Sequence, residues 1–335
     1  MDEELKVRTD GGRQQREKAL DWLTGLVPVL LISVYYYHWR AAALELLAVG
    51  GYLAAEFLLA RPCGRSHRAV RLPQAAMSGL LAAFCLPGET PLWPAALLGG
   101  LTAVLAEVPT LVSRRWPDSR LAYPLVHPVA AAFLLVRVLF PGTVTGYSVP
   151  IPWRGIDTIA SATPLAALSG AMEAPARWQL LYGIHAGTIG ETCLPAIGLT
   201  FLYLLLRRRV RLLAPVTMLG TVALLSLAFW HSPLYGVLAG SGVMAALWLS
   251  DRTYAPVKPG EQLLCGLVAG VVTVLIRRFG CWSEGTAVAV LLAHGLTPVY
   301  PTVLHGLSLG ADWSGRELRR GGEWLRRRWA ERKNQ

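Results

Sequence analysis

Charged side chains are scarce in this sequence. Only 16% of its 335 residues are Asp, Glu, Lys or Arg, whereas 53% are hydrophobic. Soluble globular domains usually carry about 25% charged residues, because their surfaces must be wetted by water. The scarcity therefore excludes a soluble globule as the main architecture and favours a chain that lies within a lipid bilayer.

Motifs for several kinds of chemistry are also missing. The sequence has no GxGxxG, P-loop or HExxH motif, so it lacks the minimal parts for nucleotide-driven transport and zinc hydrolysis. Its five cysteines form no CxxC pair, and its seven histidines show no paired spacing on one predicted helix. We therefore predict no metal site and no catalytic residue. Each histidine is first interpreted as interfacial or hydrogen-bonded.

Long apolar segments account for most of the chain. A transmembrane helix needs about 20 apolar residues, and ten segments approach or reach this length. We therefore expect an all-α, polytopic membrane protein of about ten transmembrane helices. The polar run 1–18 does not resemble a cleavable signal peptide. The predicted spans are 19–37, 41–60, 73–87, 92–112, 121–140, 190–206, 212–230, 233–250, 262–276 and 285–307.

The basic residues gather in clusters between these spans, and the formal net charge is +11. With these spans the clusters all lie on one side, together with Lys6 to Lys18. Lys and Arg are enriched on the cytoplasmic side of membranes, so we expect both termini in the cytoplasm of a multi-pass cell-membrane protein. Only Arg277 and Arg278 would face outward. The clusters are Arg61 to Arg71, Arg114 to Arg120, Arg207 to Arg211 and the tail from Arg316 to Lys333.

The segment 141–189 differs from the spans because it is rich in Pro, Gly, Thr and Ser. The topology predicts that it is an extracytoplasmic loop between two five-helix membrane halves, 19–140 and 190–307. A basic cytoplasmic tail, 308–335, follows the second half. Such a division suits an inverted repeat, although the two halves show no convincing sequence similarity.

Several ionisable residues fall within the predicted spans. A charge at the bilayer centre costs about 2.5–3.5 kcal/mol on insertion scales, so such residues mark an ion or proton route by default. Structural ion pairs are the alternative, and the sequence does not decide between them. The acidic residues are Glu45, Glu56, Glu107 and Glu284, and the candidate counter-charges are Arg137, Arg277 and Arg278.

Two motifs stand near the end of the outer loop. The first reads Asp157-Thr-Ile-Ala-Ser-Ala-Thr-Pro-Leu165, and the second reads Gly183-Ile-His-Ala-Gly-Thr-Ile-Gly-Glu-Thr192. Pro164 disfavours helix at the residue before it, so the hydroxyl of Thr163 is expected on an irregular, accessible loop. An ordinary Ser/Thr/Pro loop, glycine-mediated helix packing and a helix cap are the plain alternatives.

The first motif resembles the flavinylation segment of the RnfD and NqrB family. By that resemblance Thr163 carries FMN through a phosphoester, and Asp157 and Ser161 belong to the motif read by a flavin transferase. Ala160 and Ser161 depart from the usual pattern. The second motif closely resembles the family's Gly-Ser-Ile-Gly-Glu-Thr segment, which places Gly187, Gly190, Glu191 and Thr192 at or near FMN.

The resemblance covers nearly the whole chain, but it is dense only from Asp157 to Pro298. Val274-Leu-Ile-Arg-Arg-Phe-Gly280, Glu284-Gly285 and Leu296-Thr-Pro298 match the family's last two spans. Family members usually carry an Asn-Pro-rich segment where this chain reads Ala122-Tyr-Pro-Leu-Val-His-Pro128. Of the family's Thr-Asp-Pro, only Asp251 is retained.

The resemblance implies a membrane subunit of an Rnf-type ion-translocating electron transport complex, a translocase component that does not turn over alone. Such a complex passes electrons between ferredoxin and NAD while moving Na+ or H+. The implied partners are the A, B, C, E and G subunits of the Rnf type, a flavin transferase and the lipid bilayer, without nucleic acid. A second, non-covalent flavin (riboflavin) is a further option. The alternatives are an NqrB-type subunit of a sodium-pumping NADH:quinone reductase, or a five-plus-five-helix channel or transporter without a redox cofactor.

Overall fold

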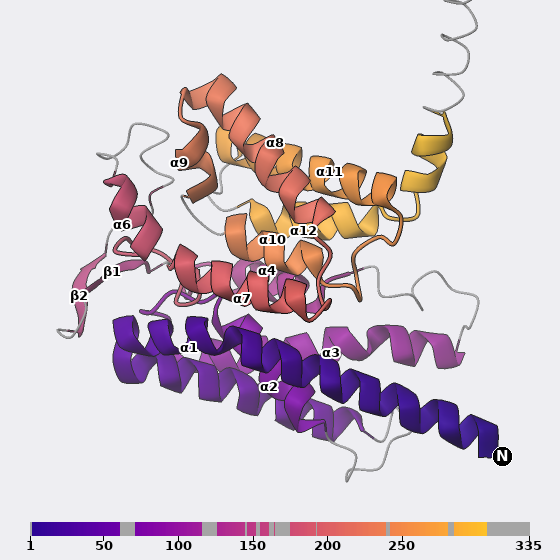
Figure 1. The fold of residues 1–335 in the computed structure, drawn as a ribbon. Coiled ribbons are helices and arrows are strands. Elements are labelled where there is room, and N and C mark those ends of the chain that lie inside the picture. The colour runs from indigo at the N-terminus through magenta and orange to yellow at the C-terminus, as the bar shows by residue number, and fades with distance from the viewer. Residues whose placement is uncertain are drawn as a thin grey trace, which may run out of the picture.

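Helices make up most of the computed structural model, as Figure 1 shows. It describes residues 2–60, 71–115, 126–144, 146–151, 155–160, 164, 175–191, 193–238, 242–280 and 285–306. The prediction of a mainly helical, polytopic membrane protein is confirmed. The helices are α1 (Asp2–Leu59), α2 (Leu72–Ala83), α3 (Leu92–Arg115), α4 (Pro128–Leu139), α6 (Arg177–Tyr182), α7 (Leu194–Leu206), α8 (Leu213–Trp230), α9 (Pro233–Leu238), α10 (Gly242–Ser250), α11 (Pro259–Phe279) and α12 (Thr286–Gly295).

Helix α1 is a hairpin of two arms. Its backbone leaves the helical conformation at His38, where φ is 53° and ψ is −138°. The hydroxyl of Ser33 donates to Glu45 Oε1 at 2.5 Å, although a straight helix would separate these residues by about 18 Å. The chain therefore reverses between them, and Figure 1 shows the two indigo arms side by side. The arms correspond to the predicted spans 19–37 and 41–60.

Three further helices are long and apolar enough to cross a bilayer. These are α3 over Leu92–Val112, α8 and α11, whereas α12 and a helix at 300–306 pass the same test only as a pair bent by 71°. The helices α2, α4 and α7 have 12, 12 and 13 residues, or about 18–20 Å. The count of ten spans stays a prediction.

The predicted spans 73–87 and 190–206 are only partly helical. The chain continues from α2 into the irregular segment 84–90, and the irregular segment 183–191 lies just before α7. Both α2 and α7 have a proline at one of their first two positions, where its missing N–H is not needed. Non-helical backbone at membrane depth is tolerated where protein covers it, and both segments are largely buried.

Glycine contacts join the long helices in pairs. A Cβ at Gly99 of α3 would overlap the backbone of Ala48 in the second arm of α1, and a Cβ at Gly270 of α11 would lie 2.9 Å from the Met218 carbonyl of α8. Small residues allow such close approach of two backbones. The same pairing thus occurs in both predicted halves. The inverted repeat itself stays a prediction.

A small β-hairpin lies in the predicted outer loop. Strand β1 (Ser148–Ile151) pairs antiparallel with β2 (Gly155–Ala160), with Pro150 opposite Ile156. No strand was expected here from the sequence, although β2 carries three β-branched residues that favour extended structure, Ile156, Thr158 and Ile159. In Figure 1 the hairpin lies at the opposite end of the molecule from the N-terminus.

Candidate functional site

Two irregular segments run together beside the β-hairpin end, and we call residues 84–90 and 183–191 the outer crossing. Pro87 and Thr188 form an antiparallel bridge. On one side of it, the Ile189 amide donates to the Leu86 carbonyl at 2.9 Å, and the Gly190 amide donates to the Phe84 carbonyl at 3.1 Å. The outer crossing therefore ties the first half of the chain to the start of the second through backbone hydrogen bonds.

The structure explains why two positions of the second motif are occupied by glycine. Gly183 ends α6 with a φ of 84°, a left-handed conformation that glycine adopts without steric cost. A Cβ at Gly190 would overlap Phe84. Since the Gly190 amide is also bonded to Phe84, this glycine serves close packing. Its amide is therefore not free to bind a ligand.

The turn of the α1 hairpin holds the outer crossing in place. The Tyr36 hydroxyl donates to the Tyr182 carbonyl at 2.6 Å, and the Tyr37 hydroxyl donates to the Gly187 carbonyl at 3.5 Å. The Arg40 guanidinium donates to the carbonyls of Gly88 and Thr90 at 3.0 and 3.3 Å. Both segments of the outer crossing are therefore anchored to the same turn of the α1 hairpin.

Glu191 lies buried at the end of the outer crossing, beside a hydroxyl. Thr188 Oγ1 donates to Glu191 Oε2 at 2.8 Å, and the Glu191 amide donates to the Thr188 carbonyl at 3.3 Å. The carboxylate therefore closes a local turn just before α7. The start of α7 itself lies at Cys193 and has no side-chain cap, so the bond to Thr188 is not the helix cap that the sequence offered as an alternative.

His185 is a buried side chain that sequence reasoning did not select as a site residue. Its Nδ1 lies 3.1 Å from the Ala186 carbonyl, and its Nε2 has no hydrogen-bond partner among the residues that the structure describes. Burial lowers the pKa of His185, and the Ala186 carbonyl only partly opposes this. The outer crossing therefore contains a buried imidazole with one nitrogen that has no partner among the described residues.

The sequence-predicted site residues are only partly placed. The structure brings Gly187, Gly190 and Glu191 together in the outer crossing, and it puts the backbone of Asp157 in β2. Three predicted residues, Ser161, Thr163 and Thr192, lie outside the described residues. The assignment of FMN to Thr163 is therefore untested by the fold.

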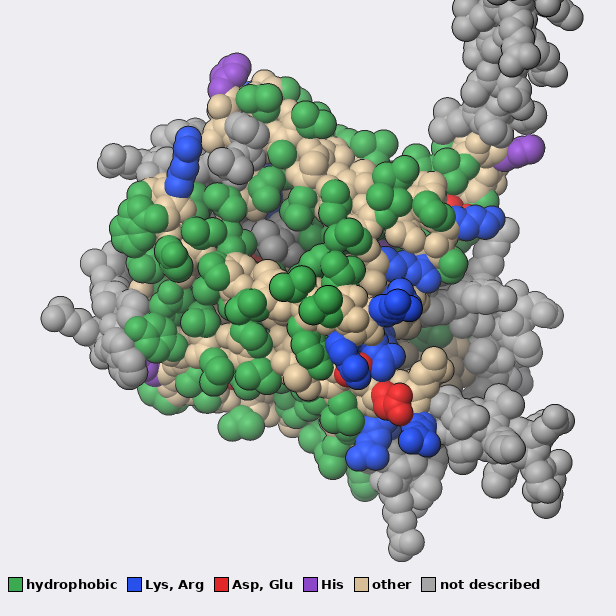
Figure 2. Space-filling model, viewed as in Figure 1, with side chains coloured by type: hydrophobic (Ala, Val, Ile, Leu, Met, Phe, Trp, Pro, Cys, Tyr) green, Lys and Arg blue, Asp and Glu red, His purple; other side chains and the backbone are tan. Residues whose placement is uncertain are grey.

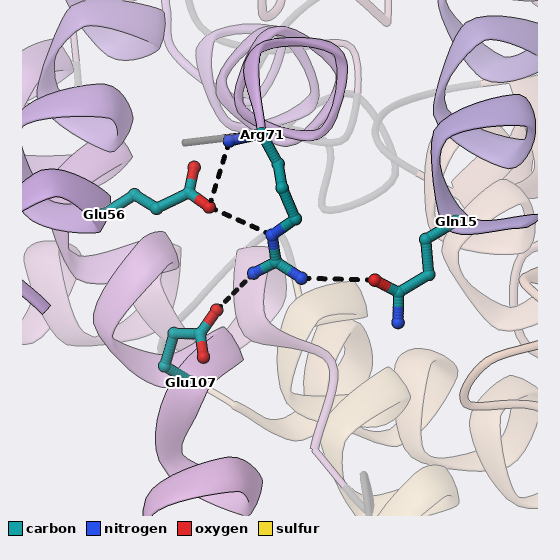
Figure 3. Close-up of polar contacts among 4 residues, drawn as sticks. All are labelled: Gln15, Glu56, Arg71 and Glu107. Carbon is teal, nitrogen blue, oxygen red and sulfur yellow. Dashed lines mark hydrogen bonds and ion pairs between the residues drawn. The ribbon is translucent and has the colours of Figure 1, made fainter. Parts of the chain in front are cut away.

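The other end of the molecule is charged. Arg71 Nε donates to Glu56 Oε1 at 3.0 Å and Arg71 also pairs with Glu107, while Gln15 lies 3.2 Å from another guanidinium nitrogen (Figure 3). The Glu56 and Glu107 side chains are 2% and 6% exposed. Other arginines were predicted as counter-charges from the sequence, whereas Arg71 is the partner of these two glutamates.

Further ion pairs at this end connect α1 to the second half of the chain. Asp21 accepts from Arg207 at 3.0 Å and from Arg209 at 2.5 Å, and Lys18 donates to Asp251 at 2.6 Å. Figure 2 shows most of the blue and red side chains of this face gathered at one end, beside a largely green surface. We call the ion-paired residues Lys18, Asp21, Glu56, Arg71, Glu107, Arg207, Arg209 and Asp251 the charged end.

Asp251 is buried at the charged end. Burial raises the pKa of its carboxyl, but Lys18 and the Thr253 amide outweigh that effect and lower the pKa below its ordinary value. The Asp251 carboxyl is therefore ionised at neutral pH.

The outer crossing and the charged end lie about one hydrocarbon thickness apart. The first arm of α1 carries Lys18 at one end and Tyr37 at the other, and 19 residues of helix rise about 28 Å. The hydrocarbon core of a bilayer is about 30 Å thick. Between these levels many leucines are exposed, among them Leu46 and Leu224 at 73% and 70%. The surface is therefore apolar over the height of a membrane, and ion pairs gather at one end of it.

Comparison with known proteins identifies relatives over most of the chain. The D subunit of the Na(+)-translocating ferredoxin:NAD(+) oxidoreductase complex of Acetobacterium woodii is 26% identical over 285 residues, 83% of this chain and 85% of the relative. The D subunit of the proton-translocating ferredoxin:NAD(+) oxidoreductase complex of Clostridium ljungdahlii is 28% identical over 241 residues, 67% of this chain and 70% of that relative.

A third relative covers more of both chains. The D subunit of the ion-translocating oxidoreductase complex of Escherichia coli K12 is 27% identical over 329 residues, which is 87% of this chain and 93% of the relative. The model of the NQR2, RnfD, RnfE family matches residues 8–305. Since that match spans nearly all of the predicted membrane region, the chain belongs to the NQR2, RnfD, RnfE family.

Proposed function

We propose that this chain is the D-type membrane subunit of an Rnf-type complex, which passes electrons between ferredoxin and NAD and moves Na+ or H+ across the membrane. The observation that carries the proposal is the family match over residues 8–305, together with three relatives that are all named as D subunits. The chain does not turn over alone in this proposal, because it lacks the motifs for nucleotide chemistry.

The test is to purify the complex from membranes through a tag on this chain. The expected result is co-purification of the A, B, C, E and G subunits with ferredoxin-dependent NAD reduction. Deletion of the gene for this chain should abolish that activity in membranes, and the wild-type gene should restore it. A complex that instead reduces quinone with NADH would assign the chain to the NqrB type. A chain that purifies alone, without flavin, and conducts ions would support a channel.

The second element of the proposal is FMN bound through a phosphoester to Thr163. Three features support it: the Ala-Thr-Pro-Leu sequence, the position of Thr163 three residues after the end of β2, and the place of β2 at the end of the molecule opposite the N-terminus. Bound FMN would supply one-electron chemistry at that end. The residues of this chain that would hold it are Asp157 and Ser161 of the motif, with Gly187, Glu191 and Thr192 beside it.

One polar atom of the outer crossing is available to bond to a flavin, whereas two backbone amides are already bonded. The buried Nε2 of His185 lacks a partner among the described residues and can bond a polar ring atom. The amides of Ile189 and Gly190 already bond to Leu86 and Phe84, so they are not available to a phosphate. We therefore assign Gly190 to packing and leave the contact with flavin to its neighbours.

Flavin attachment is tested by coexpression with a flavin transferase, followed by denaturing electrophoresis and ultraviolet fluorescence of the band. The wild type is expected to fluoresce and Thr163→Ala is expected to be dark. Thr143→Ala is the matched control, because Thr143 is another threonine of the predicted outer loop. Fluorescence that survives in Thr163→Ala, or that is absent from the wild type, would overturn the assignment.

We further propose that the charged end faces the cytoplasm, with both termini there, in a cell membrane. Arg71, Arg207 and Arg209 belong to the predicted cytoplasmic clusters and lie at the charged end. Single cysteines for labelling test this orientation: Thr143→Cys should react with an impermeant maleimide in whole cells, whereas Arg13→Cys should not. The opposite pattern would reverse the topology.

A further inference from the structure

Four aromatic side chains, three of them buried, form a group near the charged end, and we call His127, Trp248, Tyr254 and His294 the ring cluster. The His127 ring centroid lies 4.9 Å from that of Tyr254, 5.7 Å from Trp248 and 6.2 Å from His294. The rings of His127 and Trp248 are inclined by only 20°, and those of His127 and His294 by 27°. His127, Trp248 and His294 are 3%, 2% and 0% exposed.

The ring cluster joins the two predicted halves. His127 lies directly before α4 in the first half, Trp248 belongs to α10, and His294 belongs to α12. Helix α12 packs against both α4 and α10. The two histidines are visible in the sequence, but nothing there connects them, because 167 positions (294 − 127) separate them in the chain.

Several polar atoms of the ring cluster lack partners among the described residues. They are Nδ1 of His127, Nε1 of Trp248, and both ring nitrogens of His294. The Leu249 carbonyl lies near His294 but outside hydrogen-bonding geometry. Buried polar groups in proteins are almost always satisfied, by protein or by ordered water. Four unsatisfied atoms around one group of rings therefore indicate an occupant that bonds to nitrogen.

Charged residues lie beside the ring cluster on one side. Lys18 and Asp251 are within electrostatic reach of His127, and Asp251 also acts on His294. The ionisable side chains that face the two imidazoles are thus Lys18 from α1, Asp251 from the turn after α10, and Tyr254. The Asp251 side chain is 8% exposed and its partner Lys18 is 24% exposed. This ion pair therefore lies between the imidazoles and the solvent at the charged end.

We propose that the ring cluster, with ordered water, is a proton-binding site that loads from the charged end past the Lys18–Asp251 pair, so that the ion this chain carries is a proton. The inference rests on the proposed function and names its coupling ion. In the loading step an O–H bond of a hydronium ion breaks, an N–H bond forms on His294, and one water molecule is left; the His127 ring beside it is the second half of the site, and both rings are required.

The chemistry of the site favours a proton over a sodium ion. Hard cations bind oxygen ligands, whereas the unsatisfied atoms here are nitrogens. Imidazole is also the side chain that exchanges protons most readily near neutral pH. The Asp251 carboxylate offsets the charge of a loaded proton, but burial opposes it. Loading therefore requires a further negative charge, which an electron delivered to the complex supplies.

The test uses the purified whole complex in proteoliposomes with sodium-free buffer, driven by reduced ferredoxin and NAD. The variants are His127→Asn and His294→Gln, which keep a polar planar side chain but do not take up a proton. The control is His231→Asn, because His231 is exposed and has a positive φ of 53° that Asn tolerates. We expect proton uptake to fall by about 100-fold in each cluster variant, the lower range for loss of a proton-transfer group. The control should behave as wild type.

A second measurement keeps the test independent of folding. Infrared difference spectra of the wild-type complex, reduced minus oxidised, should show a histidine ring band that shifts with ¹⁵N-histidine and disappears in His294→Gln. Flavin fluorescence in the gel and the rate of NAD reduction report the proposed function separately. If wild type transfers electrons and carries flavin but moves Na+ alone, or if the cluster variants pump protons normally, the inference is overturned. Absence of electron transfer in wild type would overturn the proposed function as well.

Discussion

The outer crossing and the charged end both hold the first arm of α1 in place, but they do so through different interactions. Each one ties the first arm of α1 to a segment beyond the first half of the chain, through Tyr37 and Gly187 at one end and through Lys18 and Asp251 at the other. The outer crossing relies on backbone hydrogen bonds, a glycine contact and side-chain donors of α1 that bond to backbone carbonyls, whereas the charged end relies on side-chain ion pairs. Two different sets of interactions therefore hold the two ends of the first arm of α1.

The difference indicates what each end is suited for. Backbone pairing fixes atoms with little freedom, which suits a surface on which a cofactor must be held in one geometry. Ion pairs between long side chains depend on pH and salt, which suits a surface where ions enter. If the two ends differ in this way, substitutions at each end should have distinct costs and distinct responses to salt and pH.

Arg71→Met should have the largest effect. It leaves the buried carboxylates of Glu56 and Glu107 without their shared cationic partner, and removal of one member of a buried ion pair costs about 3–5 kcal/mol. Thermal unfolding of the detergent-solubilised protein measures the loss. The triple variant that adds Glu56→Gln and Glu107→Gln should regain much of the stability.

The matched control for Arg71 is Arg13→Met. Arg13 pairs with Glu17 on an exposed helix face, with side chains 82% and 55% exposed. Such a pair contributes at most about 0.5 kcal/mol. Equal losses in the two variants would show that burial does not govern the charged end.

Gly190→Ala should come next, because its methyl group would overlap Phe84 and push the two segments of the outer crossing apart. Overpacking of this kind costs about 1–3 kcal/mol. Gly198→Ala in α7 is the control, since nothing lies within 4 Å of a Cβ there, and it should be neutral or stabilising by about 0.5–1 kcal/mol. A Gly190→Ala protein that melts like wild type would mean that the crossing is open.

The glycine positions show how much of the outer crossing can be predicted from the sequence. The small-residue spacing of Gly183, Gly187 and Gly190 was visible, and it allowed both packing and flavin binding. The partner Phe84 lies 106 positions earlier (190 − 84), and no local pattern connects the two. Sequence reasoning therefore found the segment but could not choose between its uses.

Helix boundaries show a second limit. Hydropathy located α1, α3, α8 and α11, since each carries a long apolar run. It also extended helices into 84–87 and 190–191, because buried irregular backbone is as apolar in sequence as a helix. Arg71 was counted as a topology charge for a similar reason: its partners Glu56 and Glu107 are 15 and 36 positions away.

Asp21→Asn should have a smaller effect than Arg71→Met. Its partners Arg207 and Arg209 are 53% and 23% exposed, so water screens both pairs, and the loss should be about 1 kcal/mol. The loss should shrink further when the melting temperature is measured at high salt. A salt-independent loss would place these pairs in a drier environment than their exposure indicates.

The smallest effect is expected from pH at the outer crossing. The pKa of His185 is lowered in the folded protein by burial, so the unfolded chain binds the proton more readily than the folded one. The contribution of the neutral His185 to stability is therefore fully present above the ordinary histidine pKa of about 6.5 and decreases as the pH falls below it.

Melting temperatures of wild type and His185→Asn between about pH 5 and 8 measure this pH dependence, with the exposed His231→Asn as control. The wild type and the control should lose stability toward low pH, whereas His185→Asn should lose less. If all three curves coincide, the neutral imidazole contributes nothing to the crossing, and the acid sensitivity of the protein belongs to the carboxylates of the charged end alone.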